Sequence, residues 1–345
     1  MQYNYVMKLA YQFKLLPTYE QQCRMSKWLD MLRHQYNFLL ADRFDWYEMN
    51  KCPANACPLV CSMALPREQP EYYGQKRSTI PDGCLIKRAL VTLKADGWYV
   101  TLTLEDKSVP DNPTIDIEPT EANSIGVDAG LEYFVACSDG TMVEPPKFYR
   151  QAEEKLAKLQ AKQQLRKKGS TARRKLGSRI AKLHQQIARQ RKQWHFERAD
   201  ELVNKAEVIF VEDLKVSNMT RRNKPKQDNE GNYIANGQAQ KSGLNKSFAD
   251  AGIAGFLNEI LPYKAAKAGR LVKKVNPAGT SQHCAICLSR VPKKLSDRWH
   301  ECSCGASMPR DLNSGILIKK VGLGVRLTIK RESGKSRRRS PHSNL

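Results

Sequence analysis

Four cysteines between residues 284 and 304 have the spacing of a metal site. Cys284 and Cys287 form a C-x2-C pair, and Cys302 and Cys304 form a C-x-C pair beyond a polar loop. Thiolates paired at so short a spacing turn the chain so that two sulfurs face one ion, and two pairs complete the tetrahedral set that Zn²⁺ prefers. We therefore expect these four residues to bind zinc.

Two alternatives for this stretch stay open. Because C-x-C is tighter than the usual C-x2-C, His283 or His300 could replace one sulfur as a ligand. Four buried, unliganded thiols are the other interpretation, although pairs on both sides of a tryptophan-containing polar loop favour zinc. Upstream, Cys52, Cys57 and Cys61 lack an evident fourth ligand, so a second metal site there is the weaker prediction.

Three acids occupy positions where carboxylates gather. Asp128 and Glu212 each end a short apolar segment, and Asp311 opens a predicted helix. Apolar strands that end in acids at one sheet edge place carboxylates in a common cleft, where cations must neutralise them. Oxygen ligands select Mg²⁺ or Mn²⁺, and two such ions can activate water and stabilise the leaving oxygen of a phosphodiester. From spacing alone, each acid could equally cap a strand or a helix.

The charge of the chain points to a polyanionic partner. The 345 residues include 58 Lys and Arg against 35 Asp and Glu, which gives a formal net charge of +23 and a pI near 9.6. Nucleic acid is the first candidate, because the basic residues are spread over several segments instead of one amphipathic membrane anchor. The sequence shows no long apolar run and no signal-peptide core, so we expect a cytoplasmic protein with reduced or metal-bound cysteines.

Residues 150–203 predict two helices with a break at Gly169–Thr171. From Lys155 to Lys192 the chain carries fourteen Lys or Arg residues and no acid. A charge run usually marks a solvated face, but this unbalanced sign, followed by the aromatic residues of 194–196, favours contact with phosphates. The candidate nucleic-acid-binding residues are Arg166, Lys167, Lys168, Arg173, Arg174, Lys175 and Arg179.

The N-terminal third is predicted to hold strands and one long helix. Residues 8–15 alternate as a strand does, and Thr18 with Gln21 forms a capping box that opens a helix to about residue 48. Two strands joined at Ala95-Asp-Gly97 predict a hairpin over 85–105. One face of the helix is expected to be core, through Met25, Trp28, Leu29, Leu32, Tyr36, Leu39 and Leu40.

The remaining elements are expected to position the acids. A three-strand meander over 124–144 and apolar strands at 208–213 and 271–275 provide a sheet. Residues 215–246 are polar and predict a mobile loop, and 248–269 predict a helix that Pro262 kinks or breaks.

Several motifs in this order resemble the TnpB family. They are GVDAG, VEDL and a cysteine knuckle followed by RDLNS, with YQFKLLPT, ADGWYV, SGLNKSFAD and TSQHCAIC around them. TnpB proteins are RNA-guided endonucleases of bacterial insertion sequences, related to compact type V CRISPR effectors. The resemblance implies an α/β RuvC-like (RNase H-type) nuclease domain with a zinc-ribbon insertion, in which Asp128, Glu212 and Asp311 are the Mg²⁺-binding catalytic acids.

The same resemblance implies a domain order and partners. A noncoding RNA from the element end guides the protein to double-stranded target DNA beside a short motif, and base pairing reads the sequence. We expect a monomeric ribonucleoprotein associated with the nucleoid and without membrane contact. The expected segments are an N-terminal β-barrel-like wedge domain (1–110) with a helical insertion (16–83), a linker (111–122), the nuclease domain (123–325) with its basic helical pair (150–203) and zinc insertion (280–307), and a disordered basic tail (326–345).

One departure from the family pattern affects the prediction. Residues 74–78 pass almost directly to 79–83, where the family carries further strands and a longer helical recognition lobe. Because that lobe supports target reading, we expect weaker guided cleavage than in longer relatives. The alternative is a ribonucleoprotein that binds RNA and DNA with little or no cutting. A DNA-joining transposase is least favoured, because no His-hydrophobe-His pair with a nucleophilic tyrosine stands out.

Overall fold

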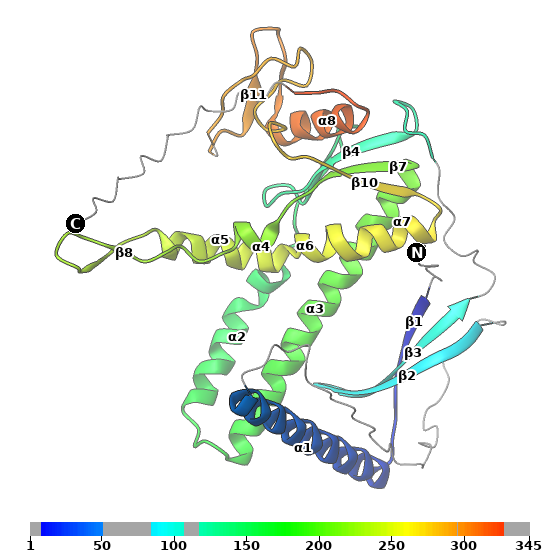
Figure 1. Ribbon diagram of the computed structural model, residues 1–345, viewed down its shortest axis with the longest axis vertical. Coiled ribbons are helices and arrows are strands. Elements are labelled where there is room, and N and C mark those ends of the chain that lie inside the picture. The colour runs from blue at the N-terminus through cyan, green and yellow to red at the C-terminus, as the bar shows by residue number, and fades with distance from the viewer. Residues whose placement is uncertain (1–7, 51–83, 107–116, 295, 328–345) are drawn as a thin grey trace. The chain divides into compact units, whose positions relative to one another are not determined.

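The computed structural model describes residues 8–50, 84–106, 117–294 and 296–327 (Figure 1). The chain divides into two compact units, Met1–Pro113 and Thr114–Leu345. The cysteines at 52–61, the shortened connection at 74–83, half of the predicted linker and most of the predicted tail lie outside the described residues. Across the part that is described, no helix has both the length and the apolar character needed to cross a bilayer.

The N-terminal unit contains an antiparallel sheet in the order β1-β3-β2. Its strands are β1 (Lys8–Lys14), β2 (Cys84–Lys94) and β3 (Gly97–Asp106), which confirms the predicted strand and hairpin. Trp98, Val100, Leu102 and Leu104 alternate along β3 and form its small core with Leu15. Within the described residues the sheet is open, so the predicted barrel is not closed there.

Helix α1 (Tyr19–Asn50) begins at the predicted capping box. The Thr18 N–H donates to Gln21 Oε1 at 2.8 Å, and the Gln21 N–H donates to Thr18 Oγ1 at 3.4 Å. The predicted core face is wrong for the described residues, because Leu29, Leu32 and Tyr36 are 43%, 45% and 66% exposed. Capping depends on neighbouring residues alone, whereas burial needs a partner, and among the described side chains of α1 it is Met25 that packs against the sheet core.

The C-terminal unit is built on a five-stranded mixed sheet in the order β10-β7-β4-β5-β6. The predicted meander is antiparallel, and β7 and β10 add to its β4 edge in parallel. This arrangement confirms the predicted α/β class. The strands are β4 (Ser124–Asp128), β5 (Val135–Cys137), β6 (Met142–Val143), β7 (Val208–Glu212) and β10 (Leu271–Val275).

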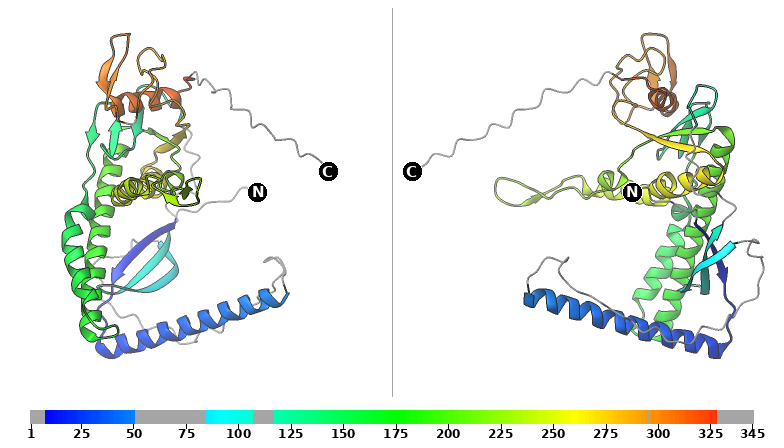
Figure 2. Two further views of the ribbon diagram at one scale, coloured as in Figure 1. Left: turned by 90° about the vertical axis from the view of Figure 1, so that its left-hand side faces the viewer. Right: turned by 45° about the vertical axis from the view of Figure 1, so that its right-hand side comes forward.

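Helices cover both faces of this sheet because its strands are apolar on both sides. Ile209 and Val211 face a core shared with α3 (Thr171–Lys205) and α7 (Leu261–Lys267), whereas Val208 and Phe210 face α8 (Arg310–Gly322). Helices α2 (Phe148–Gln164) and α3 lie side by side as the predicted pair (Figure 2). Ser170 caps α3 by accepting a hydrogen bond from the Arg173 N–H at 3.3 Å.

Two predictions for residues 215–269 are corrected. The expected mobile loop contains α4 (Val216–Met219), a hairpin of β8 (Lys226–Gln227) and β9 (Tyr233–Ile234), and the start of α5 (Gln238–Ala251). Side-chain amides close the base of this hairpin, since Asn223 Nδ2 donates to Asn236 O at 2.9 Å and Asn236 Nδ2 donates to Lys224 O at 3.0 Å. Such bonds are not visible as hydrophobic periodicity.

The predicted helix over 248–269 is interrupted at Gly252, not at Pro262. Gly252 has φ of 67°, a left-handed conformation that ends α5. The chain continues through α6 (Ile253–Gly255) and a π-helical turn η2 (Phe256–Ile260) into α7. Pro262 lies in the first turn of α7, where a missing N–H costs little.

Glycines set the distance between α8 and the sheet. A Cβ on Gly126 of β4 would lie 2.2 Å from Gly315 O, and a Cβ on Gly315 of α8 would lie 2.7 Å from Ala136 O. The backbone of α8 therefore rests directly on β4, beside the strand end that carries Asp128. The short strands β11 (Trp299–Glu301) and β12 (Ser307–Pro309) precede α8 and pair with each other.

Candidate metal centres and nucleic-acid interface

The three predicted acids meet at one edge of the mixed sheet. Val127 pairs with Val211 in the parallel register of β4 and β7, so Asp128 and Glu212 follow on adjacent strands. Adjacent strands lie about 4.8 Å apart, which brings the two carboxylates to the same edge. Asp311 is in the first turn of α8, and the close packing of α8 on β4 brings it to the same place.

The acids of this cluster influence one another's charge. Burial raises the pKa of Asp128 well above its usual value, and the charges of Glu212 and Asp311 raise it further, against a lowering by Arg310. Burial also raises the pKa of Glu212, against the hydrogen bond that it accepts from Thr280. A cation at this edge would relieve both the burial and the repulsion.

One cationic side chain lies among these carboxylates. Arg310 Nε is 3.2 Å from Asp311 Oδ1, and its Nη1 donates to Asp297 O at 3.1 Å. Both members of the ion pair are largely buried, with side chains 17% and 12% exposed. One guanidinium cannot balance three carboxylates, so the donor set at this edge fits a divalent cation bound through oxygen.

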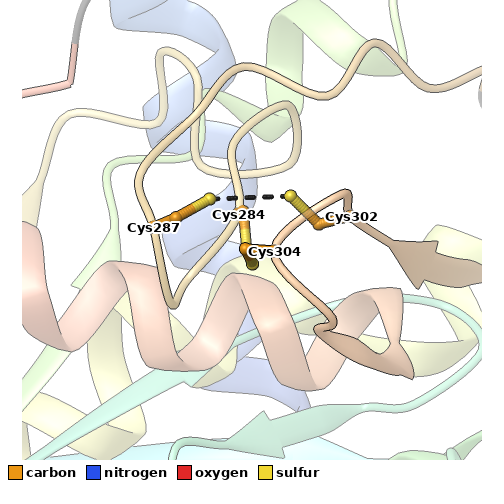
Figure 3. Close-up of side chains that lie close together, drawn as sticks. All are labelled: Cys284, Cys287, Cys302 and Cys304. Atoms are coloured by element: carbon orange, nitrogen blue, oxygen red, sulfur yellow. Dashed lines mark hydrogen bonds between the residues drawn. The ribbon is translucent and has the colours of Figure 1, made fainter.

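The four predicted zinc ligands are brought together in the structure (Figure 3). Cys284 Sγ lies 3.7 Å from Cys304 Sγ, and Cys287 Sγ lies 3.5 Å from Cys302 Sγ. All four sulfurs lie within 4.8 Å of one another. Zn–S bonds of about 2.3 Å in a tetrahedron place sulfurs about 3.8 Å apart, so this arrangement fits zinc.

The backbone of this cysteine cluster supports thiolates. The Ile286 N–H is 3.4 Å from Cys284 Sγ, and Leu288 adopts a left-handed φ of 61° that turns the chain after Cys287. Hydrogen bonds from Ser289 lower the pKa of Cys287 to about 6. A thiol in this range loses its proton readily to a metal.

The pKa of Cys304 is raised, in contrast to that of Cys287. The Ala306 N–H lowers its pKa, but burial and the three neighbouring sulfurs outweigh this effect and raise the pKa to about 12. Neither predicted alternative ligand belongs to the group. His283 Nδ1 is 2.8 Å from Gly279 O, and His300 is fully buried with neither ring nitrogen hydrogen-bonded to a described residue.

Among the His, Cys, Asp and Glu side chains of the described residues, these four cysteines are the only group of three or more whose ligand atoms lie this close together. The three acids are near enough to raise the pKa of Asp128, but they do not form an equally tight set.

Sequence reasoning missed two contacts at these candidate sites. The Thr280 hydroxyl donates to Glu212 Oε1, and Thr280 is 1% exposed. Asn313, fully buried on α8, accepts from the Ala285 N–H at 2.8 Å and donates to His283 O at 2.8 Å. Both residues lie inside noted motifs, TSQHCAIC and RDLNS, but a threonine and an asparagine carry no spacing signal of their own.

The basic helical pair presents most of its predicted contact residues to solvent. Arg166, Lys167, Lys168, Arg174, Lys175 and Arg179 are all exposed. Arg173 differs, because its Nη1 donates to Gln163 O at 3.0 Å and to Arg166 O at 3.1 Å. It therefore holds the end of α2 against the start of α3.

Two of the aromatic residues after the basic run, Trp194 and His195, pack against the core of the C-terminal unit. His195 is 3% exposed, and its ring stacks on Phe134 with centroids 5.1 Å apart. The Trp194 ring meets Phe134 edge-on at 4.7 Å. Both rings lie on the side of α3 that packs on the sheet, so their role is structural.

Asp250, which ends the motif SGLNKSFAD, fixes the other end of the pair. Its carboxylate accepts hydrogen bonds from the Tyr149 N–H at 2.8 Å and the Arg150 N–H at 3.1 Å, and it contacts Arg191 Nη2 at 3.2 Å. One buried carboxylate of α5 thus caps α2 and holds α3.

Comparisons with known proteins identify three matched segments. Residues 107–223 match the family model described as a probable transposase of the IS605 OrfB type. Residues 255–318 match the one described as a Cas12f1-like TNB domain, and residues 7–52 match a helix-turn-helix domain of IS605 OrfB proteins. The described part of that last range holds one strand and one long helix.

Relatives of known name share parts of this chain. "Putative RNA-guided DNA endonuclease InsQ" of Escherichia coli (strain K12) is 32% identical over 204 residues, which is 59% of this chain and 48% of that protein. A "Putative RNA-guided DNA endonuclease" of Streptomyces pristinaespiralis is 28% identical over 234 residues, or 67% of this chain and 52% of that protein. The chain thus spans about half the length of these relatives.

Solved structures show a partial likeness. The Cas12f1–sgRNA–target DNA complex matches with a TM-score of 0.38 and 17% identity, over 68% of this chain and 56% of that chain. The RNA-guided endonuclease CRISPR-Cas_phi3 matches with a TM-score of 0.39 and 13% identity, over 65% of this chain and 50% of that chain.

Proposed function

This chain is related to the TnpB family, and from that relationship we propose that it is an RNA-guided, metal-dependent DNA endonuclease. We assign its C-terminal unit to the RuvC-like, RNase H-type class. The observation that carries the proposal is the acid cluster: Asp128, Glu212 and Asp311 come from three elements and meet at one sheet edge, close enough for two of them to raise the pKa of the third.

The residues of this edge suit phosphodiester hydrolysis. Asp128 and Glu212 lie on adjacent strands and would hold a common cation, and Asp311 would complete the set from the helix start. Bound Mg²⁺ or Mn²⁺ supplies activation of a water and stabilisation of the leaving oxygen. Arg310 neutralises part of the negative charge and orients the Asp311 carboxylate through the 3.2 Å contact.

The partners follow from charge and from the relatives. A net charge of +23 and the exposed cations of the α2–α3 turn suit a noncoding guide RNA and duplex DNA. We propose that base pairing reads the target while the protein supplies a basic channel and the cutting edge. The cysteine cluster would hold one zinc ion and stabilise the segment that leads into α8. The setting would be the cytoplasm of a bacterium, next to its DNA.

The alternative is a ribonucleoprotein that holds RNA and DNA with little or no cutting. It is favoured by the direct passage from residues 74–78 to 79–83, where the family carries a longer recognition lobe. The basic helical pair does not depend on the acids, so RNA binding can persist where cleavage is weak.

A cleavage assay separates these functions. Protein co-expressed with its element-end RNA is incubated with a labelled duplex and Mg²⁺, beside the Asp128→Ala variant. We expect guide-dependent cutting that disappears in the variant, and slower than that of longer relatives at the same guide and salt. Retained RNA with uncut DNA in both samples would establish the binding function instead, and products joined to other DNA would indicate a transposase.

A further inference from the structure

The cysteine cluster and the acid cluster are joined by a short piece of chain. Strand β10 ends at Val275, which pairs with Glu212, and the Asp213 N–H donates to Val275 O at 2.9 Å. Nine residues later the chain reaches Cys284, the first predicted zinc ligand. The segment that follows β10 therefore leads directly from the acid cluster to the cysteine cluster.

Thr280 is the first contact between the two clusters. It is 1% exposed, its hydroxyl donates to Glu212 Oε1, and the same oxygen lies 2.9 Å from Pro277 O. The carboxylate is the stronger acceptor for the single hydroxyl proton, because hydrogen bonds to charged groups are roughly twice as strong as neutral ones. The orientation of Glu212 thus depends on where the backbone before Cys284 lies.

Asn313 is the second contact, and it works from the opposite side. It follows Asp311 by two residues on α8 and is fully buried. Its amide bonds His283 O and the Ala285 N–H, each at 2.8 Å, and so spans the backbone of Cys284. The helix turn that carries Asp311 is thereby tied to a zinc ligand.

We propose that these two side chains couple the metal sites, so that closing the zinc site tightens divalent-cation binding at the acid cluster. Without a bound metal, burial and hydrogen bonds hold the backbone at 283–285. Zinc fixes that backbone, and Thr280 and Asn313 then hold Glu212 and the start of α8 in place. The cation no longer has to order its ligands, which removes part of the cost of binding. The proposal rests on the proposed function, since it takes the acid cluster as a cation site.

Thermodynamic linkage gives the proposal a quantitative form. If zinc raises the affinity of the acid cluster for Mn²⁺ by some factor, Mn²⁺ must raise the affinity of the cysteine cluster for zinc by the same factor. Couplings between sites commonly lie between about 5-fold and 150-fold. Two buried contacts support an effect on the order of tenfold.

The test uses the full chain under reducing conditions, with zinc loaded or removed. Free Mn²⁺ is followed by electron paramagnetic resonance, and Co²⁺ absorption reports separately on the cysteine cluster. We expect Mn²⁺ to bind about tenfold more tightly to the zinc-loaded protein, and Asp128→Ala to lose this binding. Equal Mn²⁺ affinity in both zinc states would overturn the coupling and leave the acid site standing. Mn²⁺ binding that ignores Asp128→Ala would reject the acid site itself.

Variants identify the coupling residues. Thr280→Val keeps a similar size but removes the hydroxyl, and Asn313→Ala removes the amide. Each should reduce the zinc-dependent factor to about threefold or less while Co²⁺ still binds, and Thr280→Ser should restore it. If Asn313→Ala fails to fold, the Val and Ser variants of Thr280 decide the question.

Gln282 is a matched control. Its side-chain amide also bonds one backbone N–H and one carbonyl, both of Lys293 and both at 3.0 Å, but neither bond involves an acid of the cluster or a residue of α8. Gln282→Ala should leave the zinc-dependent factor unchanged. An equal loss in this variant, or full coupling in both Thr280→Val and Asn313→Ala, would show that the two proposed residues do not transmit the effect.

Discussion

Asp128 sits where its own negative charge is costly. Burial, Glu212 and Asp311 all favour its neutral form, and Arg310 opposes them only in part. Structural carboxylates are usually paired or hydrogen-bonded so that their charge is favoured. A carboxyl whose charge is disfavoured in this way is a candidate for a site where a cation completes the structure. This reasoning predicts how stability should depend on pH and Mg²⁺.

The first prediction concerns the stability of Asp128→Asn. The folded-state pKa of Asp128 lies above the unfolded value, so rising pH ionises the unfolded state first. Stability of the metal-free wild type should fall from the unfolded pKa up to the raised pKa, and the cost should persist above it. The variant lacks this cost and should melt a few degrees higher near neutral pH, since about 1 kcal/mol shifts Tm by roughly 2–4 °C.

Thermal melts of the metal-free protein check this prediction between about pH 4 and pH 8. An aspartate in the unfolded chain titrates near the lower limit, and the raised pKa of Asp128 lies above it. Added Mg²⁺ should stabilise the wild type and not the variant. A wild type whose Tm rises with pH relative to Asp128→Asn would contradict the electrostatic account of the cluster.

At the scale of elements, function depends on how closely α8 approaches β4. Gly126 and Gly315 allow backbone contact between the helix and the strand, and this contact brings Asp311 next to Asp128. In the α2–α3 pair, different residues hold the helices together and present positive charge to solvent. Ser170, Arg173 and Asp250 shape the pair, while the other cations near the turn point to solvent.

Gly315→Ala tests the close approach. The added Cβ would meet Ala136 O at 2.7 Å, and because this is backbone the helix must move. We expect a loss of roughly 1–3 kcal/mol in the free energy of unfolding. Gly243→Ala in α5 is the control, because its Cβ meets nothing within 4 Å and alanine favours a helix. Denaturant unfolding measures both, and equal stability of the two variants would refute the packing argument.

RNA binding tests the basic pair. Combined Arg174→Ala, Lys175→Ala and Arg179→Ala should flatten the slope of log affinity against log salt by up to about 0.7–0.9 per lost phosphate contact. Arg173→Ala should barely change that slope but lower Tm, because its guanidinium holds two carbonyls. Filter binding across a salt series distinguishes them, and an unchanged slope in the triple variant would make those residues a solvated surface.

At the scale of the whole chain, two units of different character are combined. The C-terminal unit has a layered core with apolar side chains on both faces of its sheet, whereas the described N-terminal unit has a small core and an exposed helix. The C-terminal unit also holds the cysteine cluster and the acid cluster. Metal occupancy should therefore govern the stability of that unit more than that of the other.

Zinc content is the measurable consequence. Metal analysis of protein purified without chelator should return about one zinc per chain. Cys284→Ser should lose it and lower the Tm of the C-terminal unit, because the binding energy of a structural zinc ion adds to the folding energy. Cys23→Ser on α1, an exposed cysteine outside the cluster, should change neither quantity. Wild-type protein without zinc would remove the site.

Local pattern was enough to predict much of this protein. Strands β4, β7 and β10 follow from short apolar runs, the hairpin from Ala95-Asp-Gly97, and the α2–α3 break from Gly169 and Ser170. The cysteine set follows from spacing, because ligands two or three residues apart must turn toward one ion. The positions of the three acids follow from strand and helix ends, although their catalytic role is a proposal.

The tertiary structure alone decided which side chains face one another. It buried His195 beside Phe134, exposed Leu32 on α1, and joined Thr280 to Glu212 across 68 residues. Periodicity and capping act within a few residues and can be read from the chain. Burial and cross-element hydrogen bonds depend on which faces pack together, and that choice is made by the whole fold.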